Sequence, residues 1–345
     1  MDLIFSYCYP LLYLRINKTN MKKIILVLSI ILVVTQSTIA CDFCNSYLGL
    51  NPHFKKNSLG VRYHYSSYKG SHHSDEELQT LSLMRTSAIQ HDGTSTTKTG
   101  VNSNDFWETR TTIELHGQWY PTQKLQLLFS LPYINNQEGV KATSNSEAEK
   151  EKPINGFGDP LLITHYQLFN IDKKSINHRL LAGGGLKFPL GNYKLADGEE
   201  AMERVHKPGS GSWDFIASAS YLAKLKRLGF NLNTSYLFTT ENNQAFQFGN
   251  RFNANGALYY ELKKKNISCF PSVGIYFEQA ARDNNNRNTL KNSGGSILYA
   301  HVGTDIYYKK FALNIAAQLP TTQSLHEPQP NIQCRIITGI TLALN

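Results

Sequence analysis

The sequence predicts an all-β fold, an antiparallel transmembrane β-barrel of about 12 strands that follows a short N-terminal periplasmic segment. Three features of the 345 residues lead to this prediction. Long runs alternate apolar and polar residues, and the connections between these runs alternate between long and short. Beyond the N-terminus, no apolar run is long enough for a membrane helix.

The clearest alternating run covers residues 107–119. Side chains alternate across a β-strand, so every second residue shares one face. One face is apolar and has an aromatic residue at each end: Trp107, Ile113, Leu115 and Trp119. The other face carries both charges: Glu108, Arg110, Glu114 and His116. Such a strand turns its apolar face to lipid and its polar face to the lumen of a membrane barrel.

Similar runs extend along the chain from residue 58. In the first run Val61 and Tyr63 oppose Arg62 and His64, and in the third the apolar face includes Leu125. The predicted strands are, in order, residues 58–68, 105–120, 124–134, 158–169, 178–190, 213–224, 228–240, 250–263, 268–281, 295–308, 310–319 and 331–344. Abundant tyrosine and phenylalanine (19 and 17 residues) are typical of barrels with aromatic girdles.

The connections between the predicted strands alternate in length. The long ones are residues 69–104, 135–157, 191–212, 241–249, 282–294 and 320–330. The short ones are residues 121–123, 170–177, 225–227, 264–267 and 309. Outer-membrane barrels place long loops outside the cell and short turns in the periplasm. A soluble sandwich would share the many short strands but not this alternation.

The N-terminal residues resemble an export signal. Lys22 and Lys23 precede an apolar run at 24–34, and small residues end at Ala40, which suits cleavage before Cys41. We therefore expect 1–20 to be a gene-model extension, 21–40 a cleaved signal peptide, 41–57 a periplasmic segment and 58–345 the barrel. The expected location is the outer membrane of a Gram-negative cell.

Basic residues exceed acidic ones, with 35 Lys+Arg, 26 Asp+Glu and a net charge of +9. Many lie in turns, such as 173–174, 263–265 and 309–310. Scattered charge on an exported chain argues against nucleic acid as a partner. Anionic lipid headgroups of the outer membrane are the partner that basic turns favour.

The sharpest local motif is Cys41-Asp42-Phe43-Cys44, with His53 close behind. Three interpretations stay open. The pair forms a disulfide, it contacts a soft metal, or Cys41 is the acylated residue of a lipoprotein. No other cofactor is expected.

Alternation also assigns ionisable residues to the lumen. They are Arg62, His64, Glu108, Arg110, Glu114, His116, His165, Arg179, Lys187, Arg251, Glu261, Glu278, His301, Asp305 and Arg335. Buried charges need partners or water. The set therefore forms either a salt-bridged wall or a polar path for a small solute. A hydrolase could draw on His116, His165 and His301 with Ser130 or Ser218. No spacing matches a catalytic pattern, so we expect no enzyme and no catalytic residue.

Two segments carry a family resemblance. Gly156, Gly158 and Asp159 open the fourth strand in a G-x-G-D pattern, which resembles the outer-membrane family named for the meta-pathway of phenol degradation. The segment from Cys41 to Tyr68 looks like Bacteroidetes members of such barrels. The resemblance implies an outer-membrane barrel with a transport role. Physically, the glycines permit a tight turn, and Asp159 can anchor it through backbone hydrogen bonds.

The predicted function is a channel or transporter for a small solute, either hydrophobic or metal-linked. The first alternative is a closed barrel with a binding or structural role through its external loops. The second alternative is an outer-membrane hydrolase.

Overall fold

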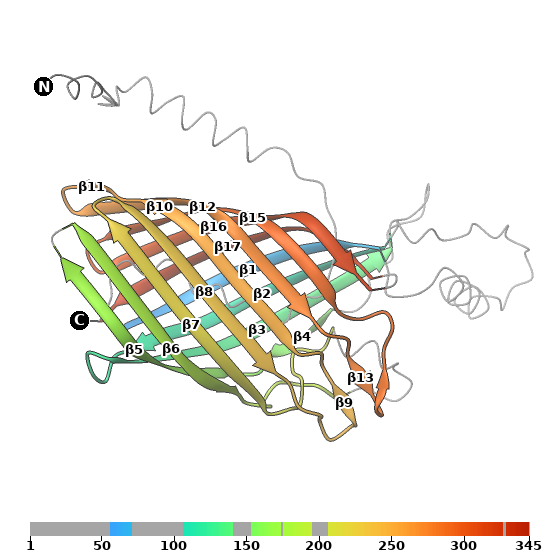
Figure 1. The fold of residues 1–345 in the computed structure, drawn as a ribbon. Helices are drawn as coiled ribbons and strands as arrows, with labels where there is room; N and C mark the ends of the chain where they lie inside the picture. Colours follow the sequence, from blue (N-terminus) through green and yellow to red (C-terminus); the bar gives the residue numbers. More distant parts are fainter. Residues whose placement is uncertain are drawn as a thin grey trace, which may run out of the picture. The chain divides into compact units, whose positions relative to one another are not determined.

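Twelve long strands form a closed antiparallel barrel in the computed structural model (Figure 1). The structure describes residues 56–70, 106–140, 153–173, 175–194, 206–326 and 329–344. The barrel strands are β1 (Ser58–Lys69), β2 (Phe106–Trp119), β3 (Leu125–Val140), β5 (Leu161–Lys173), β6 (Ile176–Lys187), β7 (Asp214–Leu225), β8 (Leu228–Phe238), β10 (Arg251–Tyr260), β12 (Ile267–Ala280), β15 (Gly295–Tyr308), β16 (Phe311–Leu325) and β17 (Asn331–Ala343). The predicted fold class is confirmed.

Each barrel strand pairs with its neighbours along the chain, and β1 pairs with β17 to close the sheet. Five short strands lie off this path. β4 (Ile154–Phe157) pairs with β3, and β11 (Leu262–Lys264) pairs with β12. β9 (Phe246–Gln247), β13 (Asn284–Asn285) and β14 (Asn288–Thr289) form a separate small sheet from two long loops. Among the described residues, no helix is long and apolar enough to span a membrane.

Most strand ends lie within three residues of the predicted ones, but β5 runs to Lys173 instead of 169, and two further strands are longer than predicted. β3 continues to Val140 and β16 to Leu325, instead of ending near 134 and 319. Residues 158–160 precede β5 instead of belonging to it. Asparagine has low strand propensity, but the pairing of β3 with β2 holds its polar end extended, and Arg110 Nε donates to Asn136 Oδ1 at 2.8 Å. The predicted leader and residues 41–55 lie outside the described residues.

Apolar side chains cover the outer face of the barrel. Val273 and Ile340 are each 60% exposed, which in water would be costly and in lipid is favourable. Exposed aromatic residues lie near both rims. Tyr260, Tyr308 and Phe311 lie beside the short turns, and Trp213, Phe215 and Phe238 lie toward the long loops. This is the girdled apolar band of a membrane-spanning barrel.

The interior divides into two halves. We call the side of the turns at 226–227 and 309–310 the short-turn end, and the side of the loops at 188–213 and 239–250 the long-loop end. Toward the long-loop end, buried residues fill the interior: Tyr68, Tyr276, Ile297, Tyr299 and Ile332. Toward the short-turn end the interior is hollow, and this hollow half is the candidate site.

Candidate functional site

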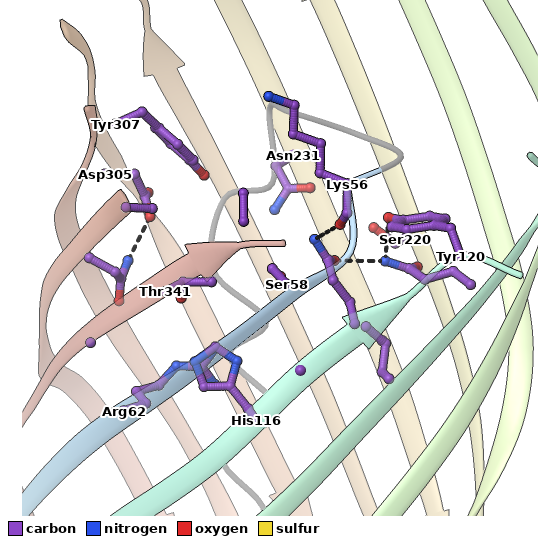
Figure 2. A pocket seen from close by; sticks show the side chains of 18 of the residues that line it. Lys56, Ser58, Arg62, His116, Tyr120, Ser220, Asn231, Asp305, Tyr307 and Thr341 are labelled. Atoms are coloured by element: carbon purple, nitrogen blue, oxygen red, sulfur yellow. Dashed lines mark hydrogen bonds between the residues drawn. The ribbon is translucent and has the colours of Figure 1, made fainter. Parts of the chain in front are cut away.

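A cavity of about 480 Å³ occupies the short-turn half of the barrel. Its walls include residues of β1, β2, β3, β5, β6, β7, β8, β15 and β17, together with the turns at 263–266 and 309–310. Figure 2 shows Asp305 and Tyr307 on one side, and Lys56, Asn231 and Ser220 on the other. Because turn residues line it, the cavity reaches the short-turn end.

An ion-pair cluster lies on the wall formed by β1 and β2. Arg62 Nη1 and His64 Nε2 each lie 3.0 Å from Glu114 Oε2, and Ser130 Oγ donates to Glu114 Oε1 at 2.6 Å. The register places Arg62 directly opposite Glu114, so the sheet itself sets this pair. His116 lies beside Arg62 in Figure 2. Glu114 is therefore fully engaged, and its charge is offset locally.

Two further polar groups face the cavity. Asp305 Oδ1 accepts a hydrogen bond from Asn314 Nδ2 at 2.8 Å. On the opposite wall, His165 Nε2 lies 2.7 Å from Ser218 Oγ, and its Nδ1 lies 3.3 Å from Gln126 Oε1. His165 reaches Ser218 across β6, where the intervening residue is Gly183. A Cβ at Gly183 would collide with the backbone of Thr164 and His165, so the close approach requires glycine here.

Apolar side chains also face the cavity, on β3, β5, β6 and β7. Leu128 lies directly opposite Ile163, and Leu222 lies directly opposite Arg179. Leu181 is the next inward residue after Arg179. Ile163, Leu181 and Leu222 are buried. One wall of the cavity therefore has an apolar part beside His165 and Arg179, and the opposite wall carries Arg62, Asp305 and Asn314.

Five lysines surround the cavity at the short-turn end: Lys56, Lys263, Lys265, Lys309 and Lys310. All five are exposed. Deeper in the cavity the cations are Arg62 and Arg179, and the lining acids are Glu114 and Asp305. Among the described residues that line it, cations outnumber acids by seven to two. The cavity therefore has a positive potential, strongest at its rim.

The filled half is organised around Arg335, which is completely buried. Its Nη2 lies 3.1 Å from Glu278 Oε2 and 3.2 Å from the Tyr299 hydroxyl, and its Nη1 donates to Gln318 Oε1 at 2.9 Å. The guanidinium also lies 4.8 Å from the centre of the Tyr299 ring. The ion pair, the hydrogen bonds and the ring contacts together offset the free-energy cost of burying this guanidinium.

A second contact in the filled half comes from the loop between β6 and β7. Asn136 Nδ2 donates to the carbonyl of His206 at 2.5 Å, and His206 Nδ1 lies 3.2 Å from Glu138. Glu108 lies 3.8 Å from His206 Nε2. Burial works against the charged imidazole, but the two carboxylates outweigh it and raise the pKa of His206 to about 9. His206 is therefore a cation at neutral pH that joins the loop to the wall.

The comparisons with known proteins agree with this fold. The family described as "Putative MetA-pathway of phenol degradation" matches residues 86–319, which is more than half of the chain. The chain belongs to this family. No curated protein matches the sequence at a significant level. The predicted family is thereby confirmed, and the Bacteroidetes origin stays a prediction.

Two solved structures illustrate the similarity. The COG4313 outer membrane channel from Pseudomonas putida F1 has a TM-score of 0.57 and 14% identity, with 88% of this chain and 100% of that chain covered. The β domain of the Bordetella autotransporter BrkA has a TM-score of 0.41 and 6% identity, with 84% and 100% covered. The first likeness supports the barrel fold. Fold and family together locate the protein in the outer membrane.

The G-x-G-D motif has a structural role in this chain. The carboxylate of Asp159 accepts hydrogen bonds from Gly191 N at 2.9 Å, from Ser210 N at 2.7 Å and from Ser210 Oγ at 2.7 Å. Lys187 Nζ lies 3.6 Å from Asp159 and also contacts Asp214. The motif therefore anchors both ends of the loop between β6 and β7.

The two motif glycines lie at the crossing from β4 to β5. Gly158 N donates to Pro132 O at 2.9 Å. A Cβ at Gly158 would meet the Pro132 ring and the Pro208 carbonyl, each at 3.0 Å. Gly156 belongs to β4, where it pairs with Ile134. Because it lacks a Cβ, Gly158 lets its backbone approach Pro132 and Pro208 closely.

The fifteen residues assigned to the lumen by alternation are all buried or half-buried. Six of them line the cavity: Arg62, Glu114, His116, His165, Arg179 and Asp305. Glu108, Lys187, Glu278 and Arg335 belong to the filled half, and Glu261 Oε2 pairs with Lys224 at 2.5 Å. Cys41, Cys44 and His53 lie outside the described residues.

Sequence reasoning missed the rim lysines and the apolar wall. Of the basic turns that favour lipid headgroups, those at 263–265 and 309–310 contribute four lysines to the lining of the cavity, and Lys56 is a fifth that the sequence does not single out. Leu128 shares the inward parity of Gln126 and Ser130, so the same alternation that identified the polar residues could have identified it. Apolar residues at inward positions are the signal that would have revealed this wall.

Proposed function

We propose that this protein is an outer-membrane channel for a small hydrophobic solute. The single observation that carries the proposal is the cavity, which reaches one end of the barrel and has apolar as well as polar walls. The family is named for phenol degradation, and the similar Pseudomonas structure is titled an outer membrane channel. Both support the movement of a small apolar molecule.

Planar-bilayer conductance of the refolded protein tests the proposal. We expect discrete conductance steps that a lipid-only membrane lacks. A Ser220→Trp variant adds bulk to the cavity wall and should lower the conductance by about half or more. Ala219→Trp, on the opposite face of β7, is the matched control and should leave conductance unchanged. Conductance no higher than that of lipid alone would overturn the channel and favour the closed barrel.

The closed barrel is the alternative that the filled half favours. The cluster around Arg335 and the loop that carries His206 occupy the long-loop half. A solute must pass these groups or displace them. Protein without conductance, together with long loops that capture a partner, would establish a binding or structural role.

A serine hydrolase is the second candidate, and the contact of Ser218 with His165 is the observation in its favour. A histidine that accepts the hydroxyl proton and is itself oriented by Gln126 is the arrangement that activates a serine. Labelling by a fluorophosphonate probe tests it. Labelling that Ser218→Ala abolishes and Ser130→Ala retains would establish the activity, and we expect no labelling from a channel.

The N-terminal assignments are also part of this proposal. We propose that residues 21–40 are a signal peptide, cleaved before Cys41 in a Gram-negative cell. Intact-mass measurement of the mature protein tests the cleavage site, and it would also reveal acylation of Cys41. Zinc titration of the wild type and of Cys44→Ser tests metal contact, since equal binding by both proteins would exclude the pair as ligands.

A further inference from the structure

The cavity combines two chemistries that one kind of solute would satisfy. Leu128, Ile163, Leu181 and Leu222 face it on adjacent strands. Arg179 lies on the same wall, directly opposite Leu222 in the sheet and two residues before Leu181. A small molecule against the leucines would thus have a guanidinium beside it. The wall therefore offers an apolar surface with a cation at its edge.

The lysines at the rim add positive charge to the cavity. Lys263 and Lys265 come from the connection between β10 and β12, and Lys309 and Lys310 from the turn between β15 and β16. Lys56 precedes β1. Exposed charges are screened within about 8 Å at physiological ionic strength. Where several of them converge on a confined space with low-dielectric walls, however, the field is focused into that space.

The acids of the cavity do not neutralise this field. Glu114 already has Arg62, His64 and Ser130 as partners. Asp305 has one oxygen bonded to Asn314, and it is buried. Each rim lysine is on a turn or strand end and exposed, so its ammonium can orient toward an incoming ligand. A cationic solute would meet repulsion at the rim, whereas an anion would be attracted.

We infer that the cavity selects small amphipathic anions, molecules with an apolar body and one carboxylate or similar group. The apolar body packs on the leucine-rich wall, and the anionic group faces Arg179 or the rim lysines. For passage, the inference rests on the proposed channel function. For binding, it stands on the cavity alone.

Binding is tested with probes that share one ring and differ in charge. Isothermal titration of the full-length protein in detergent, with detergent-only blanks, compares benzoate, benzyl alcohol and benzylamine. We expect benzoate to bind about tenfold more tightly than either of the others, because the head group alone differs. Acetate, which lacks the ring, should bind more weakly than benzoate. Equal affinity of benzoate and benzylamine, or of benzoate and acetate, would overturn the inference.

Variants locate the effect. Lys263→Gln/Lys265→Gln removes two exposed rim charges from the connection between β10 and β12, and should weaken benzoate binding by about threefold or more while benzyl alcohol is unchanged. Lys173→Gln/Lys226→Gln removes two lysines from the same end that do not line the cavity, and it is the matched control. Arg179→Gln should weaken benzoate binding further. Equal losses from the rim pair and the control pair would refute a specific site.

Passage is tested by the reversal potential in a potassium chloride gradient. We expect chloride to be favoured over potassium, and the rim variant to reduce this preference while the control pair keeps it. Benzoate binding without conductance would overturn the channel and leave the binding inference standing. Conductance that favours potassium, together with no benzoate preference, would leave the channel standing and overturn the inference.

Discussion

The two halves of the barrel interior each contain an inward-facing ion pair, but the surroundings of the two pairs differ. Both contain an arginine paired with a glutamate, Arg335 with Glu278 and Arg62 with Glu114, at 3.1 and 3.0 Å. Arg335 is enclosed by two tyrosine rings and a glutamine, with no exposed surface. Arg62 lines a cavity. Arg335 is thus held by protein alone, whereas Arg62 can be solvated from the cavity; the two glutamates are similarly exposed, at 17% and 12% of their side chains.

This difference separates structure from function along one barrel. A pair enclosed by protein depends on every partner, because a charge left alone there has no water to replace the lost group. A pair beside a cavity can exchange a protein partner for water or for a solute. The filled half therefore holds the barrel closed, and the hollow half is where a solute can be accommodated.

Substitution of the two arginines is the largest expected effect. Arg335→Met should lower the free energy of unfolding by about 3–5 kcal/mol, because buried Gln318 loses its donor and Glu278 loses its cation and keeps only tyrosine hydroxyls. Arg62→Met should cost about 1 kcal/mol, because Glu114 keeps His64 and Ser130 and gains water. Urea unfolding in lipid vesicles measures both. A double variant, Glu278→Gln/Arg335→Met, should recover part of the loss. Equal costs for the two arginines would remove the distinction between the halves.

The next largest effect on stability is expected from Asp159, which anchors the loop between β6 and β7. Asp159→Asn retains one acceptor oxygen and replaces the other by an NH2 group that would face the donors of Ser210, so it should cost about 2–3 kcal/mol. Hydrogen exchange should also accelerate in residues 206–213. Asp172→Asn, at an exposed strand end, is the control and should change stability by less than about 0.5 kcal/mol. An unchanged exchange rate at 206–213 would show that the loop is held by other contacts.

The barrel could be predicted from the sequence because membrane strands repeat one simple rule. Val61 and Arg62 must lie on opposite faces whatever the rest of the chain does, since side chains alternate in every strand. Loop lengths added the antiparallel order, and each strand indeed pairs with its sequence neighbours. Local periodicity was therefore enough to predict the fold class and, for most strands, which face points inward.

The division of the interior could not be predicted, because it depends on shear between strands. Arg335 meets Glu278 although 57 residues separate them, and alternation says only that both point inward. His206 lies in a loop and has no periodicity, yet it contacts Glu108 and Glu138. Which inward residues meet is set by the register of distant strands and by the path of the loops, and neither is local.

The smallest effect is expected from the titration of His206, which belongs to the filled half. Its folded pKa of about 9 lies above its ordinary value of 6.5, so the charged form is favoured by folding. The stabilisation is complete below pH 6.5, declines as pH rises through 9, and is lost above it. We expect the loop at 206–213 to exchange hydrogen faster at pH 10 than at pH 6, after correction for intrinsic rates.

Two controls assign that response to the imidazole. His206→Gln retains a hydrogen-bond donor without the charge, so its loop should lack the difference between pH 6 and pH 10. Residues lining the cavity should show the same protection at both values in both proteins, since Glu108 and Glu138 belong to the filled half. A response that survives in His206→Gln would assign the switch to another group. If high pH lowers the protection from exchange in the loop alone, the filled half can be loosened while the cavity is left intact.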